Sequence, residues 1–295
     1  MPKLNPVVLA VFLPLSLLCL LLSCAGSPGT NTGKPVILVV SFGTTVNETR
    51  EKTIGAIEKE IAVTYPDHEI RRAFTSQIVI DRLAKRDGLK VDNVEQAMKR
   101  LVKDKVKDLI VQPTLIMNGH EYDEKMEAIK PFEKRFASIR YGQPLLISDA
   151  DFTETASILI ENTKQFNAED TAVVFMGHGS DHEANAVYFR LDRLLKARGS
   201  NRYFVGTVEE EPSIEEIMVE LGHIGVKRVV LLPLMIVAGD HAVNDMAGDD
   251  EDSWKSILEH EGFEVIPILR GLGEYPEMQK IFVRHVAEAS HKRSR

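Results

Sequence analysis

A repeated segment constrains the fold of this chain more than any other feature. Residues 106–119 read VKDLIVQPTLIMNG and residues 226–239 read VKRVVLLPLMIVAG, so the two segments match at a constant offset of 226 − 106 = 120. Valine, lysine, proline, isoleucine and glycine stand at matching positions, and most of the other positions are apolar in both segments. A shorter pair, VVSFGT at 39–44 and VVFMGH at 173–178, has the same character. The sequence therefore predicts two copies of one structural unit.

Short apolar runs alternate with segments of helical spacing along both copies. The predicted strands are residues 36–41, 69–74, 109–112, 139–147, 172–176, 203–206, 228–232 and 264–268. The predicted helices are residues 47–64, 77–85, 91–104, 122–136, 151–165, 184–197, 213–221, 254–261 and 276–289. Strands that alternate with helices form parallel sheets covered on both faces. We predict an α/β fold of two similar domains, each a small parallel sheet flanked by helices, related by internal duplication.

The beginning of the chain has the pattern of an export signal. Lys3 precedes an apolar run from Val7 to Leu22, and small residues follow that run. This order of a charged start, an apolar core and small residues is typical of a secretory signal. We predict a signal peptide over residues 1–25, a linker over 26–34, an N-terminal domain over 35–148 and a C-terminal domain over 149–295. The expected location is the periplasm.

Two cleavage modes fit the end of this leader. A cut after Ala25 would release the protein, whereas Leu21, Leu22, Ser23 and Cys24 also fit a bacterial lipoprotein box. A lipid on Cys24 would tether the protein without a membrane span. The two cysteines of the sequence, Cys19 and Cys24, both lie in the leader. Any metal site of the exported part must therefore use histidine, aspartate or glutamate.

Charge and motifs exclude several classes of function. The formal net charge is -8, and no half of the chain is strongly basic, which argues against a nucleic-acid partner. The sequence has no GxxxxGK[ST] loop, no GxGxxG fingerprint and no HExxH helix. ATP-driven, dinucleotide-dependent and zincin chemistry therefore find no support.

The residues that follow the strands of the second copy suggest a metal site. His178, Glu209 and His241 each follow a predicted strand. Ligands of open parallel sheets collect at the carboxyl ends of the strands, so three such residues share one edge. Two imidazoles and a carboxylate can bind a divalent cation or accept protons near neutral pH. Glu209 begins a run of three glutamates, and such a run is also typical of solvated surface.

Other candidate residues have weaker support. His120 follows the third strand of the first copy, and Met117 lies close by; both are residue types that serve as axial haem ligands. His182 would be at most an auxiliary residue of the metal site. The acidic stretch formed by Asp245, Asp249, Asp250, Glu251 and Asp252 is interpreted as a solvated loop or helix start. The remaining histidines are interpreted as surface or helix residues: His68, His223, His260, His285 and His291.

Several segments resemble one known family. They are SFGTT at 41–45, MGHG at 176–179, VGTVE at 205–209 and LPLMIVAGDHAVNDMA at 232–247. They resemble the anaerobic cobalt chelatases of cobalamin synthesis, the sirohydrochlorin cobaltochelatases, which are relatives of ferrochelatase. The resemblance runs from about Pro35 to the C-terminal helix. Members of this family are typically cytoplasmic, and the export signal of this chain departs from that pattern.

The resemblance implies a reaction and a set of residues. It implies a lyase that inserts Co²⁺ into sirohydrochlorin without ATP, with His178, Glu209 and His241 handling metal and protons. Because nitrogen and oxygen ligands discriminate poorly between first-row metals, Fe²⁺ and Ni²⁺ are also expected to bind. Three arginines are candidate partners of the substrate carboxylates: Arg50, Arg71 and Arg190.

Two other classes of protein also fit the sequence. The first is a periplasmic haem or metal carrier that uses the chelatase fold, with His120 as a ligand of haem b. The second is a metal-dependent hydrolase built on the same three residues, although no extra general base is evident. Two domains that enclose a cleft are also compatible with a homo-oligomer.

Overall fold

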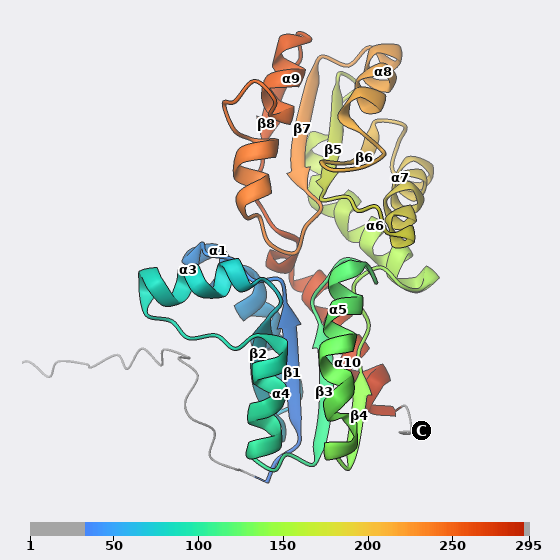
Figure 1. The fold of residues 1–295 in the computed structure, drawn as a ribbon. Helices are drawn as coiled ribbons and strands as arrows, with labels where there is room; N and C mark the ends of the chain where they lie inside the picture. The colour runs from blue at the N-terminus through green and yellow to red at the C-terminus, as the bar shows by residue number, and fades with distance from the viewer. Residues whose placement is uncertain (1–32, 292–295) are drawn as a thin grey trace, which may run out of the picture.

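The computed structural model describes residues 33–291. The predicted signal peptide, nearly all of the predicted linker and Cys24 lie outside the described residues. Two α/β domains lie end to end and are drawn one above the other in Figure 1. Among residues 33–291, no helix is both long and apolar enough to cross a membrane.

The N-terminal domain contains a parallel sheet with the strand order β2-β1-β3-β4. Its strands are β1 (Val36–Ser41), β2 (Glu69–Phe74), β3 (Asp108–Pro113) and β4 (Ser138–Tyr141). The helices between them are α1 (Asn47–Arg50), the π-helix η1 (Glu51–Gly55), α2 (Ala56–Thr64), α3 (Gln77–Asp87), α4 (Val94–Lys103), α5 (His120–Ile129) and the 3-10 helix η2 (Lys130–Arg135). The strand predicted over residues 139–147 is shorter in the structure, where β4 ends at Tyr141. Pro144 has no N–H to donate to a sheet, so the strand does not continue through it.

The C-terminal domain repeats this arrangement with the order β6-β5-β7-β8. Its strands are β5 (Thr171–Gly177), β6 (Tyr203–Thr207), β7 (Arg228–Pro233) and β8 (Glu264–Pro267). Its helical segments are α6 (Asp149–Thr163), η3 (Lys164–Phe166), η4 (Glu183–Asn185), α7 (Ala186–Arg198), α8 (Ile214–Ile224), the π-helix η5 (Ala242–Met246), α9 (Trp254–His260) and η6 (Leu272–Glu274). The predicted fold class and the predicted duplication are confirmed.

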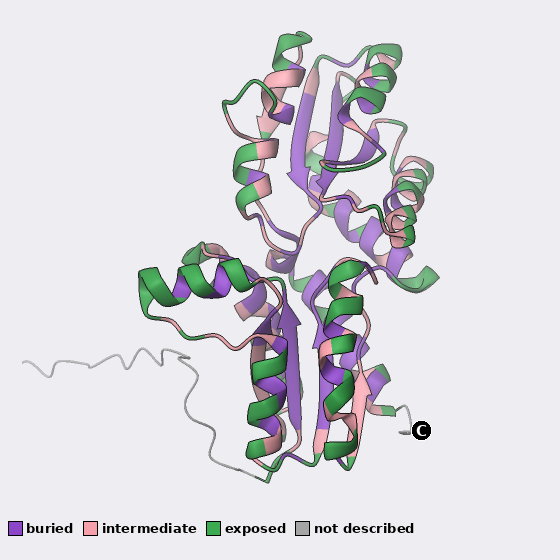
Figure 2. Ribbon diagram, viewed as in Figure 1, coloured by how far each residue is buried: buried purple, intermediate pink, exposed green. Residues whose placement is uncertain are grey.

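The central strands are buried over their whole length. Every residue of β1 and of β5 is buried, as expected for parallel strands with helices on both faces. Figure 2 shows the buried strands inside and the exposed faces of the helices outside. The apolar runs of the sequence therefore form the core of each sheet.

The last helix does not stay in the domain where the sequence prediction put it. Helix α10 (Pro276–His291) packs on α2, β3 and β4 of the N-terminal domain. Its apolar side, with Met278, Ile281 and Phe282, is buried in a cluster that contains residues of both sheets. Residues 276–291 thus belong structurally with the first sheet, and the chain crosses between the domains twice.

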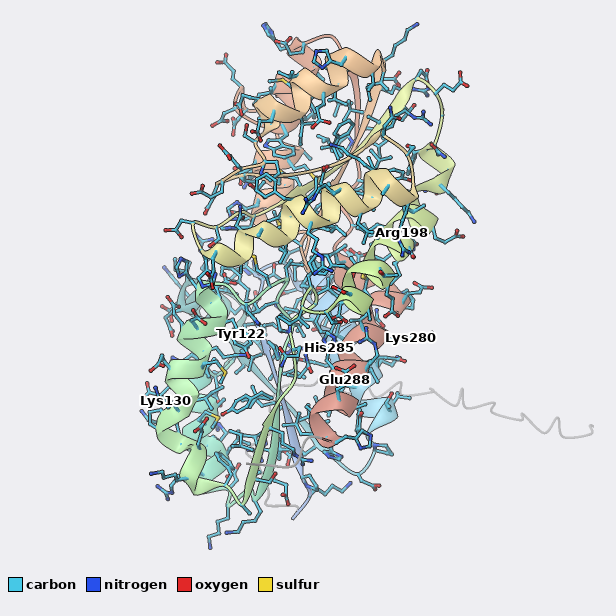
Figure 3. All side chains as sticks on the ribbon, turned by 90° about the vertical axis from the view of Figure 1, so that its right-hand side faces the viewer. Tyr122, Lys130, Arg198, Lys280, His285 and Glu288 are labelled. Atoms are coloured by element: carbon cyan, nitrogen blue, oxygen red, sulfur yellow. The ribbon has the colours of Figure 1, made fainter. Side chains whose placement is uncertain are left out.

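His285 of α10 is a buried residue. Its exposed fraction is 1%, so the predicted helix position is confirmed, whereas a surface position is not. In Figure 3, His285 lies between the ribbon layers, whereas Lys280 and Glu288 of the same helix are on its outer side. The Nδ1 atom of His285 lies 3.0 Å from the carbonyl oxygen of Gln143, and Nε2 lies 2.9 Å from Oδ1 of Asp151. Both ring nitrogens of His285 therefore contact oxygen acceptors inside the protein.

Lys125 of α5 is an unusual core residue. Its exposed fraction is 1%, and within the described part of the chain its Nζ atom has no hydrogen-bond partner. Nζ lies 3.7 Å from the centre of the Tyr122 ring. Loss of hydration lowers the pKa of the Lys125 amine to about 7.

Lys125→Met is expected to stabilise the protein. The amine binds a proton more readily in the unfolded chain, where the pKa of lysine is about 10.4, so the free energy of unfolding of the wild type rises as the pH rises from about 7 to about 10. A methionine of similar size removes this dependence and should raise the free energy of unfolding by about 2–4 kcal/mol at pH 7. Urea unfolding at several pH values measures both effects.

Lys130→Met is the matched control on the same segment. The Lys130 side chain is 68% exposed, so the free energy of unfolding of the Lys130→Met protein should stay within about 0.5 kcal/mol of the wild-type value. A Lys125→Met protein less stable than the wild type at pH 7 would show that the buried amine has a stabilising partner.

Candidate metal centre

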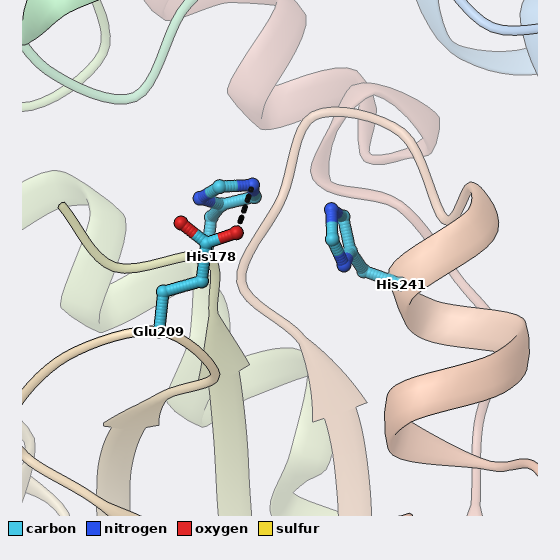
Figure 4. Close-up of side chains that lie close together, drawn as sticks. All are labelled: His178, Glu209 and His241. Atoms are coloured by element: carbon cyan, nitrogen blue, oxygen red, sulfur yellow. Dashed lines mark ion pairs between the residues drawn. The ribbon is translucent and has the colours of Figure 1, made fainter.

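Three side chains meet at the carboxyl edge of the C-terminal sheet. His178 directly follows β5, Glu209 follows β6, and His241 directly precedes the π-helix η5 after β7. One potential ligand atom from each of them lies within 4.8 Å of the others (Figure 4). The structure thus brings together the three residues that the strand-end argument selected.

His178 is held by the loop in which it lies. Its Nδ1 atom is 2.9 Å from the carbonyl oxygen of Gly179, and its Nε2 atom is 3.6 Å from Oε1 of Glu209. Gly179 has a φ of +91°, and a Cβ atom there would lie 2.9 Å from the backbone nitrogen of Glu210. The backbone N–H of Glu209 donates to the carbonyl oxygen of His178 at 3.0 Å. Glycine at position 179 therefore allows the two loops to meet.

His241 has a carboxylate partner on the next turn. Its Nδ1 atom lies 2.5 Å from Oδ2 of Asp245. The centres of the His178 and His241 rings are 4.6 Å apart, and the ring planes are nearly perpendicular at 88°. In each ring Nδ1 faces an oxygen acceptor, which favours the tautomer that carries its proton on Nδ1 and leaves the lone pair of Nε2 available for a metal.

The site is open to large molecules. The side chains of His178, Glu209 and His241 are 43%, 53% and 39% exposed. A metal ion with bonds of about 2.0–2.2 Å to nitrogen and oxygen holds its ligands closer than 4.8 Å, so the three side chains must close around an incoming ion. An exposed site that is not fully closed suits an ion that is passed on to another molecule.

Glu121 is a residue that the sequence analysis did not select. It belongs to α5 of the N-terminal domain, and it faces His178 and Glu209 closely enough for their charges to act on it. Loss of hydration raises the pKa of its carboxyl group, His178 lowers it, and Glu209 raises it. With the repeat offset of 120, Glu121 stands at the position of the first copy that is equivalent to His241 in the second copy. The duplication is therefore the sequence signal by which Glu121 could have been found.

His120 does not join the three-residue cluster. Its Nε2 atom lies 2.7 Å from Oδ1 of Asp181, and its ring centre lies 5.0 Å from that of His182. His182 accepts a hydrogen bond from the backbone N–H of Ala184 at Nδ1, and its Nε2 atom lies 3.4 Å from Asp123. The four side chains therefore join the two domains beside the metal site, and His182 takes part in this contact rather than in the cluster. The role of His120 in haem binding stays a prediction.

The three arginines considered for substrate carboxylates, together with Met117, make contacts within the protein. Arg71 pairs with Glu69 and Asp104, and Arg190 pairs with Asp149. Arg50 is buried and donates to Asn47. Met117 packs against the main apolar core. Each of these arginines thus has a partner within the described part of the chain. Asp245 lies in the first turn of η5 with its side chain 44% exposed, which agrees with its interpretation as part of a helix start, and its carboxylate also contacts His241.

The two-domain fold also occurs in solved structures. The fold resembles that of SirB from Bacillus subtilis with Fe³⁺, with a TM-score of 0.62, 17% identity and coverage of 88% of this chain and 96% of that chain. It also resembles CbiX, described as the terminal enzyme of sirohaem biosynthesis in denitrifying bacteria, with a TM-score of 0.52, 14% identity and coverage of 87% and 99%. These likenesses show one class of fold, a two-domain α/β fold.

Sequence comparison identifies the family within this class. A family model described as cobalt chelatase (CbiK) matches residues 35–291, and the chain belongs to this family. A sirohydrochlorin cobaltochelatase of Salmonella typhimurium is 40% identical over 256 residues, which cover 87% of this chain and 96% of that protein. Sirohydrochlorin cobaltochelatase CbiKC of Nitratidesulfovibrio vulgaris is 35% identical over 258 residues, with coverage of 87% and 90%. The resemblance noted in the sequence is confirmed.

Proposed function

We propose that this protein is a sirohydrochlorin cobaltochelatase, a lyase that inserts Co²⁺ into sirohydrochlorin without a nucleotide. The observation that carries the proposal is the open cluster of His178, Glu209 and His241 at the edge of the C-terminal sheet. Membership of the cobalt chelatase family and the activity named for the relatives support the same substrate and metal.

The geometry suggests how the site acts. Insertion replaces the two inner N–H protons of the macrocycle by one divalent ion, so two protons leave for each metal that enters. His178 and His241 would hold the ion through Nε2, and Glu209 would balance its charge. Imidazole and carboxylate groups can also accept the departing protons near neutral pH. Glu121 of the other domain lies close enough to His178 and Glu209 for their charges to act on it, and it is a further candidate to accept a proton.

An insertion assay with several metals tests the proposal. The purified protein is mixed with sirohydrochlorin and Co²⁺, Fe²⁺ or Ni²⁺, and the change in the absorbance of the pigment is followed. We expect insertion of Co²⁺, with slower insertion of the other two metals because the ligand set discriminates poorly between them. No enzyme-dependent insertion of any of the three metals would contradict the proposed function.

A haem-carrier function is a second candidate, favoured by one observation. His120 is 57% exposed beside the domain contact, so its ring is accessible to a large flat ligand. Isolated protein with bound haem b would show a Soret band, and His120→Ala should remove that band. A protein that binds no added haem would exclude this function.

The proposed location is the periplasm. The support is the leader pattern of residues 1–25 and the Cys24 position. Cell fractionation and the mass of the mature N-terminus would distinguish a released protein from a lipid-anchored one. Sedimentation of the purified protein would show whether it forms a homo-oligomer.

A further inference from the structure

The two histidines of the metal site differ in the partner of Nδ1. In His241, Nδ1–H donates to the carboxylate of Asp245 at 2.5 Å. In His178, Nδ1–H donates to the neutral backbone carbonyl of Gly179 at 2.9 Å. The first contact joins an imidazole to a charged acceptor, and the second joins it to a peptide dipole.

This difference affects how each ring binds a metal. Hydrogen bonds to an ionised acceptor are about twice as strong as neutral ones. A carboxylate behind a metal-binding histidine fixes its tautomer and orientation and makes the ring a stronger electron donor, and loss of such a partner typically lowers metal affinity about 10–100-fold. His241 should therefore bind a divalent ion more tightly than His178 does.

The local backbone places Asp245 within reach of His241. Both residues lie at the π-helix η5, which begins directly after His241. The backbone N–H of Gly248 donates to the carbonyl oxygen of Asn244 at 3.0 Å, and a Cβ atom at Gly248 would lie 2.3 Å from that oxygen. Glycine at 248 therefore permits the turn that ends this segment. Irregular helical turns of this kind are frequent at functional sites.

We infer that Asp245 is a positioning residue that makes His241 the anchoring ligand of the incoming metal, while His178 is the ligand that releases the ion to the macrocycle. The inference rests on the proposed function and adds a division of roles between the two histidines. The ion would enter against His241 and Glu209, and a nitrogen of the macrocycle would then replace His178, the weaker ligand, before it replaces His241.

Co²⁺ binding to the protein without tetrapyrrole tests the role of Asp245. Asp245→Ala should weaken Co²⁺ affinity about 10–100-fold. Asp245→Asn keeps an oxygen acceptor and should recover part of the loss. Asp250→Ala is the matched control, because it removes an exposed carboxylate of the same stretch five residues further along. It should leave the affinity unchanged.

Proton spectroscopy of the Co²⁺ complex provides a second readout, which a merely structural role would not change. The Nδ1–H protons of both metal-bound histidines should appear as exchangeable signals shifted by the paramagnetic ion. In Asp245→Ala, the signal of His241 should shift and exchange faster, while that of His178 stays unchanged. Wild-type affinity together with an unchanged His241 signal in Asp245→Ala would overturn the inference.

The division of roles has its own test, which separates it from the proposed function. His178→Ala should bind Co²⁺ more tightly than His241→Ala does, although neither inserts it. Equal loss of Co²⁺ affinity in the two variants would overturn the division. If the wild-type protein binds Co²⁺ with these differences but does not metallate sirohydrochlorin, the proposed function fails while the anchoring role of His241 stands.

Discussion

Replacing His178 or His241 by alanine is expected to abolish Co²⁺ insertion into sirohydrochlorin and to leave the fold intact. Each ring supplies a metal-binding nitrogen and a proton acceptor to the reaction, and loss of such a group typically costs about 100-fold or more in rate. Both side chains are about two-fifths exposed and lie outside the apolar core, so their removal leaves no cavity there. The rate of the change in pigment absorbance measures the loss.

His223→Ala is the matched control for these variants. His223 lies near the end of α8 and is exposed, so its removal should change neither the insertion rate nor the unfolding temperature. The unfolding temperatures of the two active-site variants should also match that of the wild type. If His178→Ala and His241→Ala both insert Co²⁺ at the wild-type rate, the three-residue cluster is not the site of the reaction.

Much of the fold could be predicted because the relevant signals are local. The buried strands are continuous apolar runs, and the repeat shows that the same unit occurs twice. The placement of α10 could not be predicted in this way. An amphipathic helix shows which of its sides is buried, but its own sequence does not show which sheet it covers. Sequential elements usually pack together, and α10 departs from that tendency by crossing back to β3 and β4.

The site could be predicted to the extent that it follows from strand ends. His178, Glu209 and His241 are close in space because parallel strands end at one edge. Glu121 reaches the site from the other domain. The spacing of residues along the chain does not show how the two domains are oriented relative to each other, so this contact could not be predicted in the same way. Asp245 is one of several carboxylates in an acidic stretch. Its contact with the His241 ring depends on the irregular turn of η5, which the sequence pattern did not predict.

The second large effect is expected at Asp151, which links α6 to α10, the two helices that follow the crossings between the domains. Asp151 is fully buried at the start of α6. Its Oδ1 atom accepts from Nε2 of His285 at 2.9 Å and from Nη2 of Arg284 at 2.8 Å, both on α10. Its Oδ2 atom accepts from the backbone N–H and the hydroxyl of Ser148 at 2.8 and 2.7 Å.

Asp151→Ala is expected to lower the free energy of unfolding by about 3–5 kcal/mol at pH 7. Removing one partner of a buried ionic network leaves the other without compensation, and here His285 and one N–H of Arg284 lose their acceptor. Urea unfolding of the wild type and the variant measures the difference. Glu154→Gln is the matched control, because Glu154 also accepts from Arg284 but is 44% exposed and should cost about 1 kcal/mol or less.

The same network predicts how stability depends on pH. Burial would raise the pKa of the Asp151 carboxyl group, but hydrogen bonds from His285, Ser148 and Arg284 outweigh it and hold the pKa well below its usual range. The unfolded chain, with an aspartate pKa of about 3.9, then binds the proton more readily than the folded protein does. This contribution is therefore complete above about pH 4 and is lost as the pH falls towards the folded value. Asp151→Asn should show a shallower loss of stability than the wild type between about pH 4 and pH 2, and an equally steep loss in both proteins would mean that another carboxylate controls acid unfolding.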